Sequence, residues 1–287
     1  MKIEEVYKQK KRTLSFEIFP PKHEDALQNI DETLDILASL KPDFISITFG
    51  AGGSVNNNKT IYLAKKIKEK YGIEPLVHLT GLYYNKAEIY AFLAEIKKNG
   101  IKNVLALRGD RREDVCAKED FCFASDLMNH IQKSESDFCV AGACYPEVHP
   151  QSKNRVEDIN ALKHKTENGC AFLVSQLFFE NDNFYDFCQF CKVAGVNVPI
   201  SAGIMPVINK KQIEKMVSLC GAKLPPRFKR ILETYGENKE ALFDAGLSYA
   251  ISQIIDLTAN GVDGIHLYTM NNPQIANRIV DGIKRII

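Results

Sequence analysis

Short apolar runs rich in β-branched residues alternate with amphipathic segments along most of this chain. Runs of this length and composition are typical of buried strands, and apolar positions spaced three and four apart are typical of helices. The pattern predicts eight strands, at Thr13–Phe19, Phe44–Phe49, Pro75–Thr80, Asn103–Leu107, Phe138–Cys144, Phe172–Phe178, Val198–Ile204 and Gly264–Tyr268. It also predicts helices at Ala26–Leu40, Lys59–Tyr71, Ala87–Lys98, Ser125–Lys133, Val156–Asn168, Asn183–Ala194 and Pro273–Ile287.

Eight strand–helix units in 287 residues match the usual size of a (β/α)8 barrel, in which each parallel strand needs a crossover connection. We therefore expect a single catalytic barrel domain over residues 1–287. Extra helical segments between the seventh and eighth strands predict an elaboration of this barrel, at Lys210–Leu219, Pro226–Tyr235 and Ala241–Asn260. The competing fold is a doubly wound open sheet, but the turn Gly50–Val55 lacks the third glycine of the dinucleotide fingerprint.

Composition narrows the class of protein. The net charge is +1 and no basic stripe is visible, so we expect neither nucleic acid nor an anionic membrane as a partner. The segment Met1–Arg12 is rich in Lys and Glu and carries no apolar leader, which favours a cytoplasmic protein. Eight scattered cysteines predict free thiols, and the pair Cys188 and Cys191 lacks a second ligand pair at zinc spacing. Six scattered histidines give no metal-binding pattern either, so no metal site is predicted.

Glu17 is the most informative single residue. Strand alternation places Ser15 and Glu17 on one face, and Leu14, Phe16 and Ile18 on the other, so Glu17 faces inward at a strand end. An apolar pocket disfavours the charged carboxylate and raises its pKa, which would suit a general acid. The alternative is a glutamate paired with a basic neighbour.

Other polar residues follow the predicted strands at the barrel end where active sites lie. Gln176 ends an apolar strand, where its amide could bind a ligand amide or a pterin-like edge, or instead a backbone carbonyl. The run Arg108–Asp110 suits an anionic ligand, or a local ion pair. His78 on its apolar strand is more typical of a satisfied core histidine. His149 lies between prolines in a rigid loop that could hold a ligand or only itself.

Six segments, in this order, resemble methylenetetrahydrofolate reductase of the bacterial type, and the similarity runs nearly end to end. The segments are Ser15-Phe16-Glu17 with Pro20-Pro21, Thr48-Phe49-Gly50-Ala51-Gly52-Gly53-Ser54, His78-Leu79-Thr80, Ala106-Leu107-Arg108-Gly109-Asp110, Tyr145-Pro146-Glu147-Val148-His149-Pro150 and Gln176-Leu177-Phe178-Phe179. The resemblance implies a flavin-dependent (β/α)8 barrel that is homo-oligomeric.

The resemblance also implies roles for individual residues. It makes Glu17 the general acid and Asp110 the carboxylate beside flavin and pterin. The positions that match FAD-lining residues of the family are Thr48, Phe49, Ala51, His78, Arg108, Gly109, Asp110, Ala124, Tyr145, His149, Ser152, Asp158 and Lys165. The positions that match substrate-side residues are Glu17, Thr48, Asp110, Gln176, Gln212 and Tyr268.

The implied reaction is the reduction of 5,10-methylenetetrahydrofolate to 5-methyltetrahydrofolate, which supplies methyl groups for methionine synthesis. NADH or NADPH would reduce FAD and leave before folate enters the same pocket. Phe49 stands where relatives carry tyrosine or tryptophan, and Asn272 where a relative carries an arginine near the folate tail. Two other functions stay open: a flavin-free pterin-binding methyl transferase, and a folate- or flavin-binding module without turnover.

Overall fold

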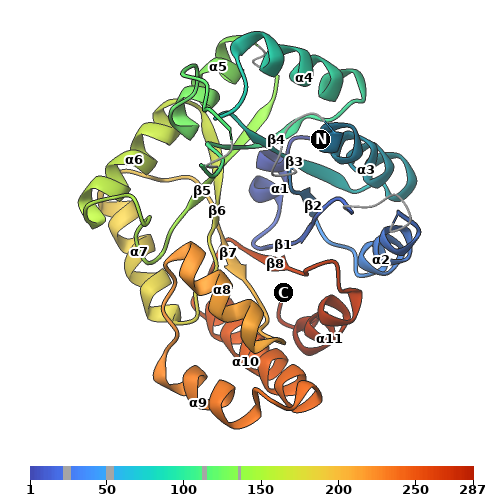
Figure 1. Cartoon of the computed structure of the whole chain (residues 1–287), viewed down its shortest axis with the longest axis vertical. Helices are drawn as coiled ribbons and strands as arrows, with labels where there is room; N and C mark the ends of the chain where they lie inside the picture. The colour runs from blue at the N-terminus through green and yellow to red at the C-terminus, as the bar shows by residue number, and fades with distance from the viewer. Residues whose placement is uncertain (22–26, 50–54, 112–114, 135–136) are drawn as a thin grey trace.

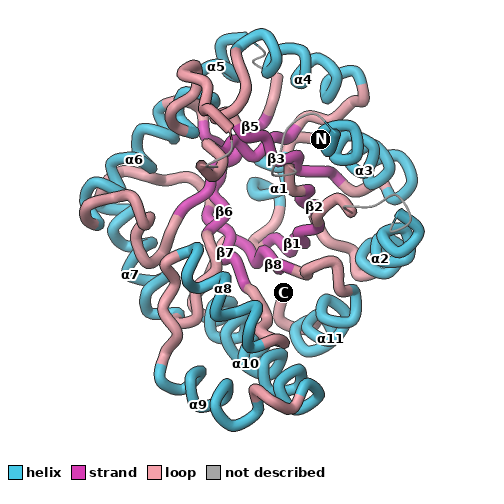
Figure 2. The backbone as a smooth tube through the Cα atoms, viewed as in Figure 1, coloured by secondary structure: helices cyan, strands magenta, loops and turns pink. Residues whose placement is uncertain are grey.

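Eight parallel strands close into a barrel in the computed structural model, which describes residues 1–21, 27–49, 55–111, 115–134 and 137–287. The strands follow one another around the barrel in sequence order, and β8 pairs with β1 to close it. Figure 2 shows them as an inner ring with helices outside. They are β1 (Thr13–Ile18), β2 (Phe44–Ile47), β3 (Glu74–Thr80), β4 (Asn103–Leu107), β5 (Cys139–Cys144), β6 (Cys170–Ser175), β7 (Ile200–Ile204) and β8 (Gly264–Tyr268). The (β/α)8 prediction is confirmed.

The helices cover the outside of the barrel in chain order (Figure 1). They are α2 (Leu27–Ser39), α3 (Val55–Tyr71), α4 (Lys86–Lys98), α5 (Ala124–Ser134), α6 (Arg155–Glu167), α7 (Asn181–Val193) and α11 (Pro273–Ile283). The extra helices α8 (Lys210–Cys220), α9 (Pro226–Tyr235) and α10 (Lys239–Ala259) lie between β7 and β8, as predicted. None of the described helices has the length and apolar character needed to cross a bilayer.

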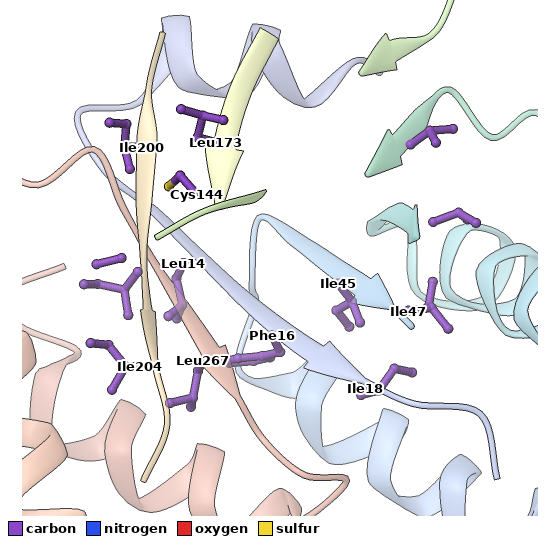
Figure 3. Close-up of a cluster of buried hydrophobic side chains, with 14 of the residues drawn as sticks. Leu14, Phe16, Ile18, Ile45, Ile47, Cys144, Leu173, Ile200, Ile204 and Leu267 are labelled. Carbon is purple, nitrogen blue, oxygen red and sulfur yellow. The ribbon is translucent and has the colours of Figure 1, made fainter. Parts of the chain in front are cut away.

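The outward faces of the strands form the main hydrophobic core. Leu14, Phe16 and Ile18 of β1 lie in this core with apolar residues of the neighbouring strands and of the covering helices (Figure 3). Phe16 and Ile18 are completely buried, and each such side chain contributes roughly 1.5–3 kcal/mol through removal from water. The alternation that buries these three side chains turns Ser15 and Glu17 into the barrel.

The barrel interior is apolar near the amino ends of the strands, here called the lower end, and polar near their carboxyl ends, here called the mouth. Phe44, Leu76 and Phe172 form the lower layer with Ile3. Above them lie the inward side chains of the strand ends, which the site is built from.

A short first helix, α1 (Ile3–Gln9), closes the lower end and was not predicted. Ile3 is completely buried, and its backbone N–H donates to Asn103 Oδ1 at 2.8 Å. The Tyr7 hydroxyl lies 2.7 Å from Ser201 Oγ inside the barrel. Seven residues with only Ile3 and Val6 buried are too few to give a visible helical pattern, so tertiary contacts define this helix.

The extra helices have a small core of their own. It joins residues that follow β6 and β7 to apolar positions of the three helices, including Phe179, Met205, Ile213, Phe228 and Leu242. The Tyr249 hydroxyl of α10 donates to the Phe179 carbonyl at 2.7 Å, and Gln253 donates to the Phe178 carbonyl at 3.0 Å. These contacts fix α10 against the end of β6, so the extra helices have a defined place beside the barrel mouth.

The substitution Asn103→Ala tests how α1 is held. It leaves the buried Ile3 N–H without its acceptor, so the free energy of unfolding should fall by about 1–3 kcal/mol. Urea unfolding followed by circular dichroism measures the change. The exposed Asn197→Ala should change the free energy by less than about 0.5 kcal/mol, and equal losses from both variants would contradict this account.

Candidate active site

Glu17 lies at the barrel mouth between two histidines that come from distant strands. Its Oε2 atom is 3.6 Å from His78 Nε2 of β3 and 3.6 Å from His266 Nε2 of β8. One fifth of the Glu17 side chain is exposed, whereas His266 is almost completely buried. In the strand register, Glu17 is paired with Ser46 on one side and Tyr268 on the other. The inward prediction for Glu17 is therefore confirmed.

The expected rise in the pKa of Glu17 is wrong. Burial does raise this pKa, but a hydrogen bond from His266 and the attraction of His78 and His266 outweigh it, so the pKa lies below its ordinary value. The apolar neighbours Phe16 and Ile18 suggested an apolar pocket, yet they point to the helices. The alternative, a glutamate with basic partners, describes the site better.

His78 has an unsatisfied ring nitrogen at this mouth. Its side chain is 8% exposed, and within the described residues Nε2 has no hydrogen-bond partner. Burial lowers the pKa of His78 to about 4, so the ring is neutral at pH 7. A buried nitrogen without a partner is costly, and a polar ligand atom could satisfy it.

The chain after β8 holds the backbone beside Glu17. The Thr269 hydroxyl donates to the Glu17 carbonyl at 2.7 Å, and Asn271 exchanges two side-chain hydrogen bonds with the Phe19 backbone, at 2.8 and 3.0 Å. Met270 and Asn271 both have φ of 54°, a conformation that side chains rarely adopt. Strain of this kind persists where surrounding contacts require it. Here it accompanies the hydrogen bonds of Thr269 and Asn271 to the backbone of Glu17 and Phe19.

Gln176 and Tyr268 lie on neighbouring parts of the same mouth. Gln176 follows β6 and is half-buried, and its Oε1 accepts from the backbone N–H of Leu177 at 2.8 Å. This leaves the side-chain NH₂ group as the donor that could read a ligand. The Tyr268 hydroxyl donates to the Ser175 carbonyl at 2.7 Å, and the Tyr145 hydroxyl interacts with the Gln176 side chain. Burial raises the pKa of Tyr145 to about 12, so this phenol is neutral.

The β4 end carries Arg108, Gly109 and Asp110. Arg108 binds the side chain of Gln151 and donates to the Gly109 carbonyl at 3.1 Å, so it connects the end of β4 to the loop after β5. Gly109 has φ of 92°, and a Cβ there would lie 3.1 Å from the Thr80 Cβ, so both conformation and space favour glycine. Asp110 is exposed at the mouth.

A second polar group lies along the loop after β5 and on α6. Asp158 is buried and accepts from the His149 N–H and the Ser152 hydroxyl, both at 3.3 Å. Lys165 donates to the Ala143 carbonyl at 2.7 Å, and burial lowers its pKa. Burial outweighs the hydrogen bonds at Asp158 and raises its pKa. The loop residue Val148 has φ of 76°, a strained value for a β-branched residue.

The remaining predicted site residues lie in varied places. Thr48 is half-buried directly after β2, and Ala124 begins α5. The Phe49 ring is buried against Tyr84 and Phe92, with ring centroids 5.8 and 5.1 Å away. Gln212 lies in the first turn of α8 and lines a small hollow with the segment after β7, and Ala51 lies outside the described residues.

The structure thus brings three groups of predicted residues to one end of the barrel. Glu17 and His78 form one group, Gln176 with Tyr145 and Tyr268 a second, and Asp158 with His149 and Ser152 a third. His266 was missed. Its signal was present in the sequence, because it precedes Tyr268 by two residues and so shares its inward face.

A family model described as methylenetetrahydrofolate reductase matches residues 2–284. The chain belongs to the methylenetetrahydrofolate reductase family. "5,10-methylenetetrahydrofolate reductase" from Escherichia coli (strain K12) is 33% identical over 266 residues, which cover 93% of this chain and 88% of that protein. "Methylenetetrahydrofolate reductase (NADH) 1" from Arabidopsis thaliana is 37% identical over 284 residues, 94% of this chain and 48% of that protein. The chain therefore spans about half the length of this plant member of the family.

Solved structures support the barrel fold. A protein from Clostridium thermocellum, described as binding two copies of 5-methyl-5,6,7,8-tetrahydrofolic acid, superposes with a TM-score of 0.73 at 18% identity, covering both chains fully. Dihydropteroate synthase from Xanthomonas albilineans has a TM-score of 0.54 at 13% identity, covering 96% of this chain and 91% of that one. At these identities the likeness concerns the fold alone.

His78→Gln tests the burial of the neutral ring. Because the folded pKa of His78 is about 4 and the unfolded value near 6.5, unfolding takes up a proton between these pH values, and stability falls as the pH falls. Replacement by glutamine should remove on the order of 2 kcal/mol of this acid-induced loss. Urea unfolding at pH 7 and pH 4.5 measures it, with the exposed His164→Gln as the control. An unchanged pH dependence would contradict the burial of a neutral His78.

Proposed function

We propose that this protein reduces 5,10-methylenetetrahydrofolate to 5-methyltetrahydrofolate with NADH or NADPH, through bound FAD. The observation that carries the proposal is the Glu17 carboxyl, held between His78 and His266 at the mouth of a barrel that belongs to this family. The names of the bacterial relatives support the reaction, and the names of the plant relatives support NADH.

The residues along β4, β5 and α6 fit a flavin nucleotide. FAD carries an anionic diphosphate, ribose hydroxyls and a polar ring edge. Lys165 is a half-buried cation bound to a carbonyl, with further hydrogens to offer a phosphate, and Asp158 is a buried acceptor suited to a hydroxyl. The unpartnered His78 nitrogen suits a polar atom of the ring. When bound, the flavin supplies hydride transfer between the nicotinamide and the folate.

Glu17 acts on the folate. Its proton passes to N10, the bond from N10 to the bridging carbon breaks with its electron pair going to N10, and the carbon remains on N5 as an iminium that can accept hydride. In the ligand-free protein the pKa of Glu17 is low, but a folate covering the mouth removes water and disfavours the carboxylate, so the acid form becomes accessible.

Other residues orient the two substrates. The NH₂ group of Gln176, which also faces the Tyr145 hydroxyl, suits an acceptor atom of a pterin. Thr48, Gln212 and Tyr268 would supply further substrate contacts. The Asp110 carboxylate would add negative charge beside the flavin, which favours transfer of hydride from the reduced flavin to the folate. One mouth serves nicotinamide and folate in turn, which gives ping-pong kinetics.

The wider setting follows from the same proposal. The product supplies methyl groups for methionine synthesis, in a cytoplasmic homo-oligomer in which residues 1–287 act as one catalytic domain. Asn272 caps α11, accepting from the Gln274 N–H at 3.0 Å, so its side chain is engaged where a relative has an arginine for the folate tail. The cation that an arginine would offer the folate tail is therefore absent at this position.

Glu17→Gln separates the two halves of the reaction. Flavin reduction by NADH should stay within about twofold of the original protein, whereas folate reduction should fall by roughly 10²–10⁴-fold because the acid is gone. Stopped-flow absorbance of each half-reaction measures both. The exposed Glu233→Gln is the control, and unchanged folate reduction in Glu17→Gln would refute the assignment.

Lys165→Met tests the flavin site. Methionine keeps the length of the side chain but removes the cation, so the dissociation constant of FAD should rise at least about tenfold, the effect of roughly 1.4 kcal/mol. Quenching of flavin fluorescence during titration measures it. Lys163→Met, two residues away and exposed, should leave FAD affinity unchanged, and equal affinities in both variants would place the nucleotide elsewhere.

A further inference from the structure

His266 lies below Glu17 in the barrel interior, with every side of its ring occupied. Its Nδ1 atom is 2.8 Å from Ser15 Oγ, and its Nε2 atom is 3.4 Å from Ser46 Oγ and 3.6 Å from Glu17 Oε2. The Phe44 ring stacks on it at an interplanar angle of 20°, and the Tyr268 ring meets it edge-on at 89°. The ring is 1% exposed, so its polar atoms can bind only these neighbours.

The strand register brings the polar residues of this network together inside the barrel, where their burial costs free energy. β1 and β8 pair Ser15 with His266, and β1 and β2 pair Glu17 with Ser46, so three strands each contribute an inward polar residue. Barrel interiors at this level are usually filled by branched apolar side chains. Buried polar groups cost free energy unless they are hydrogen-bonded, and here the network ends on the carboxyl at the mouth.

The hydroxyl of Ser15 lets the ring exist in two protonation states. Ser15 Oγ lies 3.3 Å from the Ile265 carbonyl, to which it can donate while accepting from an Nδ1–H. A neutral ring with its hydrogen on Nδ1 offers a lone pair on Nε2 to a protonated Glu17. A charged ring offers an Nε2–H to a Glu17 carboxylate. In both states the Nδ1–H can donate to Ser15 Oγ while Nε2 faces Glu17 Oε2.

We propose that His266 is a positioning residue for Glu17: held by Ser15 and Ser46, it orients the carboxyl and exchanges a proton with it during folate reduction. This inference rests on the proposed role of Glu17 as the acid. In the exchange, the Nε2–H bond of the charged ring breaks and an Oε2–H bond forms, leaving a neutral ring and a neutral carboxyl. Glu17 then gives that proton to N10 of the folate. After the product leaves, the partly exposed Glu17 takes up a proton from water and passes it to the ring.

The other titratable groups facing Glu17 in the described part of the chain are unsuited to this exchange. The pKa of His78 is about 4 because of burial, so its ring stays neutral at pH 7. Burial raises the pKa of Tyr268 well above its ordinary value, so this phenol keeps its hydrogen. The more distant Tyr145 and Cys144, which face Tyr268, also have pKa values raised by burial and are neutral. His266 is the partner that remains.

Two substitutions at His266 separate orientation from proton exchange. The amide of Asn reaches the position of Nδ1 and keeps the bond to Ser15 but loses Glu17, whereas the amide of Gln reaches the position of Nε2 and contacts Glu17 without titrating. The control is Ser201→Ala, which alters the barrel interior beside Tyr7 and away from Glu17. Ser15→Ala, a smaller change, releases Nδ1 and serves if the His266 variants fail to fold.

The first readout is independent of activity. Carboxyl ¹³C chemical shifts of the full-length protein without ligands, with the Glu17 signal assigned by its loss in Glu17→Gln, give the Glu17 titration directly. His266→Asn should raise the midpoint by at least about one pH unit, since it removes the group that favours the carboxylate. Ser15→Ala should shift it in the same direction by less, and Ser201→Ala should leave it unchanged.

The second readout is the pH profile of each half-reaction. Flavin reduction by NADH should be unchanged, whereas folate reduction at pH 7 should fall at least tenfold in His266→Asn, partly recover in His266→Gln, and shift its pH profile in both. An unmoved Glu17 midpoint and pH profile would make His266 a packing residue and overturn the inference. If the midpoint moves but the original protein does not reduce folate, the proposed function fails and the coupling stands.

Discussion

Closure of eight parallel strands into a barrel is the constraint on which the other features depend. Closure brings β8 against β1, and so brings His266 and Tyr268 beside Ser15 and Glu17, about 250 residues earlier in the chain. It also gathers all the strand carboxyl ends at one mouth, where loops can carry polar groups without disturbing the core. The lower end of the barrel is closed by α1 and filled by apolar side chains.

The electrostatics of the mouth follow from this packing. A carboxylate surrounded by hydrocarbon would be protonated, but Glu17 has an imidazole on each side, and these outweigh its burial. One of the two rings, His78, is neutral and has a nitrogen to offer, while the other is part of a hydrogen-bonded network. The protein without ligands therefore favours the charged carboxylate of Glu17, and a bound ligand that excludes water would shift the balance toward the neutral form.

The sequence predicted the architecture well because strand and helix periods are local properties. All eight strands and the three extra helices stand where the pattern placed them, within a few residues. It could not predict the pKa of Glu17, since that depends on His78 and His266, which lie 61 and 249 residues away in the chain. The helix α1 was missed for the same reason, because Asn103 and Ser201, which hold Ile3 and Tyr7 of this helix, lie far from it in the chain.

The central claim is that this barrel mouth passes hydride from a nicotinamide to a folate through a flavin. The most direct test is an absorbance spectrum of the freshly purified protein, followed by anaerobic addition of NADH and then of 5,10-methylenetetrahydrofolate. The account predicts yellow flavin bands that bleach with NADH and return with the folate. A colourless protein that gains no flavin bands from added FAD would contradict it, and would favour a flavin-free pterin-binding barrel.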